Sequence, residues 1–237
     1  MAQHSSKTEP QLEGLELNRE ILRLALPALG ALLAQPLFTT IDSAMVGHLG
    51  TEQLAGLALS STILMTAVGL FIFLAYSTTS ITARALGAGN IASGLRAGIE
   101  AIWLAALLGV ITASALILAA PIIISWFQAD TTVIPHAIAY LQYSSPGLVG
   151  MLVVLAATGT LRGLLDTKTP LYVATAGAAG NAALNAIFIY GLDMGIAGSG
   201  LGTAIAQTLM VIILVAVVVK GARREGVSLK PSFGGLL

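Results

Sequence analysis

Six long apolar segments, separated by short polar breaks, dominate this sequence of 237 residues. They cover residues 21–46, 54–79, 95–119, 135–161, 170–190 and 196–219. A helix needs about 20 mostly apolar residues to cross the hydrocarbon layer of a membrane, and each segment is long enough. Only 9% of the residues are charged, against about 25% in soluble domains. The sequence therefore predicts an all-α membrane protein, a bundle of six transmembrane helices that has the lipid bilayer as its solvent.

The basic residues indicate how such a bundle is oriented. The 11 Lys and Arg residues precede or begin the first segment, lie at the second and fourth connections, or follow the sixth segment: Lys7, Arg19, Arg23, Arg84, Arg96, Arg162, Lys168, Lys220, Arg223, Arg224 and Lys230. The first, third and fifth connections contain none. Because cytoplasmic loops carry the excess of Lys and Arg, both termini are predicted to be cytoplasmic. Residues 1–19 then form a polar cytoplasmic tail, residues 20–220 the helical lobe, and residues 221–237 a cytoplasmic linker.

Composition and motifs exclude several functions. The chain has no cysteine, which excludes disulfides and cysteine-based metal sites. Its net charge is zero and it has no extended basic block, so we expect no nucleic-acid partner. HExxH, GxSxG and Walker motifs are absent, so we expect neither an enzyme nor a bound cofactor.

Asp42 is the acidic residue that lies deep within a predicted span, whereas Glu100 lies near a span end, four residues after Arg96, where an ion pair is expected. A charge at the bilayer centre costs at least roughly 2.5–3.5 kcal/mol. Helical spacing puts Gln35, Thr39 and Asp42 on one polar face, which should look into the bundle. Two interpretations stay open at this point: a carboxylate that binds protons or cations, or a structural carboxylate satisfied by neighbouring amides and hydroxyls.

Further polar residues recur at helical spacing in the later spans. Asn181 and Asn185 share one face of the fifth span, and Thr203 and Gln207 share one face of the sixth. Together with Asp42 and a phenol such as that of Tyr140 they could line a polar chamber, although amides also serve simply as contacts between helices.

Two prolines lie inside the first span, Pro27 and Pro36. Each removes a backbone hydrogen bond and favours a kink. The kink is either a static bend or the hinge of a helix that has two states.

Several motifs together resemble one transporter family. They are ALP at 25–27, IDSAMVGHLG at 41–50, RALGAG at 84–89, LRG at 161–163, DTKTP at 166–170, GN at 180–181 and LN at 184–185. The sequence from about residue 18 to residue 230 resembles the multidrug and toxic compound extrusion (MATE) transporters, in particular the bacterial DinF-type subgroup.

This resemblance implies an antiporter of the bacterial inner membrane. Members have twelve helices in two six-helix lobes and exchange organic cations or other toxic compounds for protons or sodium. The present chain would be the amino-terminal lobe, and its partners would be a small organic substrate and a second six-helix lobe that is missing or supplied by another chain. The alternative is a non-transporting membrane scaffold, or a half-transporter subunit that requires a partner chain.

The resemblance also assigns roles to individual residues. Asp42, Asn181, Asn185, Thr203 and Tyr140 match the ion site of the amino-terminal lobe, and Pro27 matches the proline that bends its first helix. Some relatives have an acid where this chain has Asn185, and the loss of that charge weakens a sodium site at Asp42. Proton coupling is therefore the expectation, with sodium as the alternative.

Overall fold

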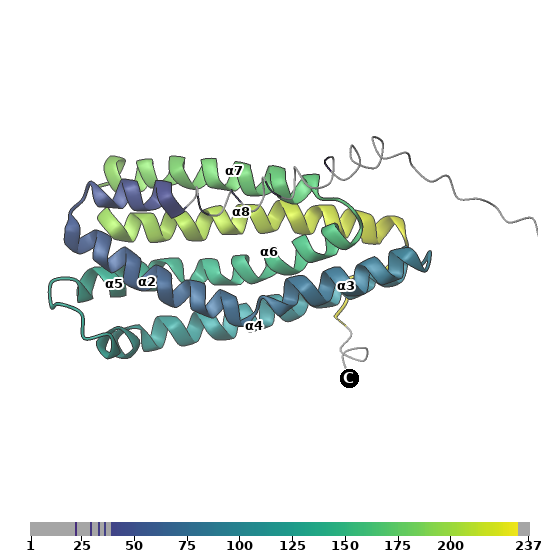
Figure 1. Cartoon of the computed structure of the whole chain (residues 1–237), viewed down its shortest axis with the longest axis horizontal. Coiled ribbons are helices and arrows are strands. Elements are labelled where there is room, and N and C mark those ends of the chain that lie inside the picture. The colour runs from purple at the N-terminus through teal and green to yellow at the C-terminus, as the bar shows by residue number, and fades with distance from the viewer. Residues whose placement is uncertain (1–21, 23–28, 30–32, 34–35, 37–38, 232–237) are drawn as a thin grey trace, which may run out of the picture.

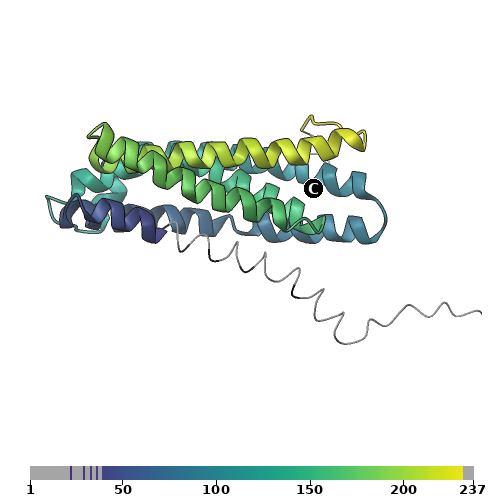
Figure 2. The same ribbon diagram turned by 90° about the horizontal axis from the view of Figure 1, so that it is seen from above.

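The computed structural model describes residues 22, 29, 33, 36 and 39–231. Residues 39–47 are helical and are followed by the helices α2 (Thr51–Leu70), α3 (Phe73–Gly87), α4 (Ile91–Trp126), α5 (Ile134–Ser144), α6 (Pro146–Gly163), α7 (Lys168–Asn185), η1 (Ala186–Gly191) and α8 (Gly195–Arg224). No strand occurs among the described residues. The long helices lie side by side along one axis, with the connections at the two ends of the bundle (Figures 1 and 2).

Five helical stretches are long and apolar enough to cross a membrane: Thr51–Gly87, Ile91–Trp126, Pro146–Gly163, Lys168–Gly191 and Gly195–Arg224. They correspond to the second to sixth predicted spans. Most of the first predicted span, including Pro27 and Gln35, lies outside the described residues, as does the tail over residues 1–19. The predicted all-α bundle is confirmed over the part of the chain that the structure describes.

Three of the predicted spans are interrupted in the structure. Segment 54–79 divides into α2 and α3 at residues 71–72, and hydropathy does not detect this turn because Phe71 and Ile72 are themselves apolar. Segment 135–161 divides at Ser145, because Pro146 has no N–H to continue the helical ladder. Segment 170–190 changes to the π-helical turn η1 after Asn185.

Every Lys and Arg among the described residues lies at or near one end of the bundle, which we call the basic end. It contains the α3–α4 and α6–α7 connections and the C-terminus of α8, on the right in Figure 1. Arg96 forms the predicted ion pair there, with 2.8 Å between its Nε and Oε1 of Glu100. Its Nη1 also donates to the carbonyl of Ser228, 3.0 Å away, and thus holds the segment after α8 against α4.

Glycines allow α3, α4 and α6 to approach closely in the half of the bundle near the basic end. A Cβ placed on Gly159 would lie 2.6 Å from the carbonyl oxygen of Ala75, and one on Gly163 would lie 2.7 Å from that of Thr79. A Cβ on Gly98 would lie 2.5 Å from Cγ2 of Thr160. We call this region the glycine junction; its spacing of Gly159 and Gly163 is the small-xxx-small pattern of close membrane helices.

Candidate ion-binding site

Asp42 is buried in the half of the bundle away from the basic end, with 4% of its surface exposed. Its carboxylate accepts three hydrogen bonds from side chains of three later helices. Ser199 Oγ and Asn185 Nδ2 both donate to Oδ1, over 2.6 and 2.7 Å. Tyr140 Oη donates to Oδ2 over a longer 3.3 Å. A buried charge persists only when such donors replace its hydration, so the carboxylate ties the first helix to α5, α7 and α8.

A second row of hydrogen bonds supports these donors. Asn181 lies one helical turn before Asn185, and its Oδ1 accepts a hydrogen bond from Nδ2 of Asn185 over 3.3 Å. Its own Nδ2 donates to Oγ1 of Thr203 on α8, 3.2 Å away. The structure thus brings together the five residues that the resemblance assigned to the ion site: Asp42, Tyr140, Asn181, Asn185 and Thr203.

The backbone around Asn185 is specialised. Asn185 is the last residue of α7, and the chain continues directly into the π-helical turn η1. Such turns are rare and occur frequently at functional sites. A Cβ on Gly202 of α8 would collide with Oδ1 of Asn185, so the glycine admits this side chain between the helices. Oδ1 of Asn185 is buried and has no hydrogen-bond partner among the described residues.

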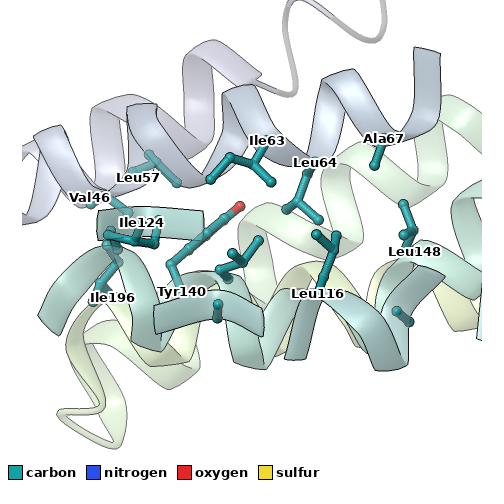
Figure 3. Packing of buried hydrophobic residues seen from close by; sticks show 14 of the residues in the cluster. Val46, Leu57, Ile63, Leu64, Ala67, Leu116, Ile124, Tyr140, Leu148 and Ile196 are labelled. Atoms are coloured by element: carbon teal, nitrogen blue, oxygen red, sulfur yellow. The ribbon is translucent and has the colours of Figure 1, made fainter. Parts of the chain in front are cut away.

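A small cavity of about 120 Å³ lies beside the carboxylate. Thr39, Asp42, Ser61, Tyr140 and Thr203 contribute polar groups to its wall, and Leu57, Leu64, Met65 and Met151 contribute apolar ones. Figure 3 shows the Tyr140 ring packed among aliphatic side chains, with its hydroxyl directed towards α2. The hydroxyls of Ser61 and Thr203 lie within hydrogen-bonding reach of it. The predicted chamber is therefore narrow.

Gln207 does not line this cavity. It lines a second, larger hollow of about 490 Å³ between α2–α3, α6 and α8, which shares Met65 and Met151 with the cavity at Asp42. On α8, Thr203 therefore lines the cavity at Asp42, whereas Gln207, one turn further along, lines the larger hollow. The other predicted chamber residue, Gln35, lies outside the described residues, as does Pro27.

Pro36 is described, and its carbonyl accepts hydrogen bonds from Oγ1 of Thr39 and of Thr40, over 2.9 and 2.8 Å. The residues on either side of it are not described. The bend at Pro36 therefore stays a prediction.

Sequence reasoning missed Ser199, which makes the shortest hydrogen bond to Asp42. A signal was present, because Ser199, Thr203 and Gln207 repeat every four residues along α8 and the pattern can be extended back by one turn. Ser61 was missed as well. It lies in α2 beside Ser60 and Thr62, and nothing in that run of hydroxyls indicates which one faces Tyr140.

The chemistry of the site follows from its donors. The groups that face Asp42 donate an amide N–H and two hydroxyl hydrogens to it, while the two hydroxyl oxygens and the unpartnered Oδ1 of Asn185 also carry lone pairs. No cluster of three or more His, Cys, Asp and Glu residues occurs in the described ranges. Chemically, these neighbours can stabilise Asp42 as a hydrogen-bonded carboxylate or as a protonated carboxyl group, and the oxygens of the site can also contribute to binding a small cation.

Comparison with known proteins adds the family context. Residues 27–187 match the MatE family. The chain is 33% identical over 228 residues to Protein DETOXIFICATION 44, chloroplastic, of Arabidopsis thaliana, and the match covers 89% of this chain and 42% of that protein. It is 29% identical over 218 residues to DNA damage-inducible protein F of Escherichia coli K12, covering 89% of this chain and 46% of the relative.

Solved structures agree with these matches. The bent form of the MATE transporter VcmN of Vibrio cholerae superimposes with a TM-score of 0.82 at 24% identity, over 93% of this chain and 49% of that one. The fold is therefore that of one lobe of these transporters. The chain spans less than half the length of the curated relatives cited here.

Proposed function

The chain belongs to the MatE family, and from this premise we propose that it is the amino-terminal lobe of a secondary antiporter that exports drugs or other toxic organic compounds in exchange for protons. One observation carries the proposal. Asp42 is a buried carboxylate bonded to donors on three other helices, and it lines a cavity that shares two methionines with a larger hollow. A proton at Asp42 can therefore alter contacts between helices beside a space of ligand size.

Protonation would act first on the bond to Tyr140. Oδ1 of Asp42 already accepts two short hydrogen bonds, whereas Oδ2 accepts a single long one. A proton would be placed on Oδ2, which then donates to the Tyr140 oxygen, and the Tyr140 hydrogen would turn towards Ser61 or Thr203. This reversal links the protonation state of Asp42 to α2 and α8, and a ligand that prefers one arrangement is coupled to the proton.

The proposed orientation follows the charge asymmetry. The basic end would face the cytoplasm of a bacterial inner membrane, with both termini on that side. Asp42, in the opposite half of the bundle, would exchange protons with the outside. A second six-helix lobe would complete the pathway for the substrate, as alternating access between two repeats requires.

The test uses this lobe together with a second six-helix lobe, reconstituted in proteoliposomes under an imposed pH gradient. Asp42→Asn should abolish gradient-driven efflux of a fluorescent organic compound, because its side chain can still accept hydrogen bonds but cannot take up a proton. Glu100→Gln is the matched control, since it removes an acid that is paired with Arg96 near the basic end. Undiminished coupled efflux in Asp42→Asn would overturn the proposal.

Coupling to sodium instead of protons is distinguished in the same system. A sodium gradient at equal pH on both sides should drive no efflux through the unaltered protein. If a sodium gradient drives efflux and Asp42→Asn abolishes it, then sodium is the coupling ion that the carboxylate binds.

A further inference from the structure

The larger hollow contains polar groups that the proposed proton site does not use. Gln207 is 7% exposed, and its amide has no hydrogen-bond partner among the described residues. Arg162, at the end of α6, lines the same hollow and is only partly exposed. Its guanidinium, which is always charged, has neither an ion pair nor a hydrogen bond within the described part of the chain.

These two groups have hydrogen-bonding capacity that no described residue uses. The amide of Gln207 and the guanidinium of Arg162 are both open to the hollow, so a ligand there can bond to them directly. None of the described residues that line the hollow is acidic. The hollow therefore offers one positive charge and one amide, with no negative charge to balance them.

The rest of the wall is apolar and adaptable. Met65, Met151 and Met210 face the space from three sides, on α2, α6 and α8. Methionine adjusts to irregular apolar shapes and makes favourable contacts with aromatic rings. The volume of about 490 Å³ falls in the range of roughly 300–1,000 Å³ that is usual for small-molecule sites.

We propose that this hollow binds a small amphipathic organic anion, an aromatic carboxylate in chemical class. Its carboxylate would pair with Arg162, which can donate two parallel hydrogen bonds to it, and its ring would lie among the methionines. Gln207 would supply a further donor. The inference rests on the proposed export function by naming the class of its substrate, and it gives that substrate a charge opposite to that of an organic cation.

The experiment measures equilibrium binding and needs no transport. The whole chain is placed in nanodiscs of phosphatidylcholine, and three probes with one naphthalene ring are titrated by calorimetry: 2-naphthoate, its neutral methyl ester and 2-naphthylmethylammonium. We expect naphthoate to bind at least about tenfold more tightly than the ammonium compound, as one charge-assisted hydrogen bond allows. Equal binding of the three probes, or tighter binding of the cation, would overturn the proposal.

Variants locate the binding. Arg162→Gln should weaken naphthoate binding by about tenfold and leave the ester within about twofold, whereas Arg162→Lys should keep the preference for the anion. Gln207→Leu should weaken naphthoate binding by a smaller factor. The matched control is Lys220→Gln, an exposed cation near the same end of the bundle that does not line this hollow. An equal loss in Lys220→Gln and Arg162→Gln would show only a general charge effect and would contradict the site.

Two further measurements test whether the hollow is occupied instead by a lipid headgroup or by part of the chain itself. Phosphatidylglycerol added to the nanodiscs should not displace naphthoate, and displacement would assign the hollow to a lipid headgroup. Because the chain has no cysteine, Met151→Cys introduces a single thiol into the wall. Naphthoate should slow its reaction with a thiol reagent, whereas a thiol that is unreactive with or without the probe would show that the chain itself fills the space.

The experiment distinguishes failure of this inference from failure of the proposed antiport. Asp42→Asn should keep the preference for naphthoate over the ammonium compound even where its affinity changes, because Asp42 itself does not line the larger hollow. Anion binding without proton-coupled efflux would sustain this inference while the proposed function fails. Coupled efflux of cations without anion binding would support the proposed function and overturn this inference.

Discussion

The glycine junction and the surroundings of Asp42 contain similar polar residues but use them in different ways. In the glycine junction the hydroxyls of Thr78, Thr79 and Thr160 bond to carbonyls four residues back in their own helices. Around Asp42 the hydrogen bonds connect residues that are 98, 143 and 157 positions apart in the chain. The first region is held by close backbone packing, and the second by bonds between helices that a proton can change.

The difference indicates which half of the lobe is suited to movement. Interdigitated backbones have no alternative arrangement of similar energy, because separating them leaves gaps. Hydrogen bonds to a carboxyl group have two arrangements, one for each protonation state. We therefore expect changes in the Asp42 region to alter coupling and changes in the glycine junction to alter folding.

The largest effect is expected from overpacking the glycine junction. Gly163→Leu would force side-chain atoms against Thr79 and Thr82 of α3, and we expect a loss of at least about 3 kcal/mol of stability or failure to fold. Thermal unfolding in detergent, monitored by circular dichroism, measures this loss of stability. The control is Gly69→Leu, where a Cβ would meet no atom within 4 Å. Equal tolerance of both variants would show that the helices are not held by this contact.

A smaller loss is expected from removing the acceptor at the centre of the site. Asp42→Ala leaves the donors of Asn185 and Ser199 buried without their shared acceptor, at about 2–4 kcal/mol for the two groups. Asp42→Asn keeps one carbonyl oxygen and should cost about 1 kcal/mol. Denaturation of the two variants in the same detergent makes the comparison. Equal stability of the Ala and Asn variants would contradict the hydrogen-bonded arrangement.

Single hydroxyls sharpen the contrast further. Ser199→Ala removes a bond between helices and should cost about 1 kcal/mol. Thr160→Val removes a hydroxyl that bonds only within α6, where the carbonyl keeps its helical partner, and should change stability by less than about 0.5 kcal/mol. Unfolding of the two variants in the same detergent measures both losses of stability. A larger loss of stability in Thr160→Val than in Ser199→Ala would contradict the proposed difference between the glycine junction and the Asp42 region.

The smallest effect concerns Asp130, in the connection between α4 and α5. The backbone N–H of Thr132 donates to its Oδ1 over 2.9 Å and, with the hydroxyl of Thr132, lowers the pKa of this exposed carboxyl group. A group whose pKa is lowered by folding stabilises the protein above its ordinary pKa, and this contribution is lost as the pH falls through the lowered value.

The melting temperature should therefore decrease slightly more on acidification below about pH 4 in the unaltered protein than in Asp130→Asn. Melting curves between pH 2.5 and pH 7 test this. An identical pH dependence of the two proteins would show that the turn contributes nothing to stability.

Several features could be predicted because they depend on single residues and their spacing. The apolar spans, the burial of Asp42 and the pair of Arg96 with Glu100 follow from hydropathy and from the four-residue repeat of a helix. Helical spacing pointed to Asn181, Asn185 and Thr203 as residues of a polar chamber, and the resemblance to the family assigned these residues and Tyr140 to an ion site. Periodicity alone could not decide whether the amides form a binding site or only contacts between helices, because both arrangements give the same spacing.

The sequence by itself determined that this chain is a membrane-spanning helical bundle with one basic end and one deep acid, because transfer to lipid is costly for every charge regardless of its neighbours. The tertiary structure decided that Ser199 and Asn185 share one oxygen of Asp42 and that Gln207 faces a different hollow with Arg162. These choices depend on how far each helix is rotated and how closely it approaches the next. Glycine contacts such as Gly202 with Asn185 and the π-helical turn at η1 set those distances, and they form only when distant parts of the chain meet.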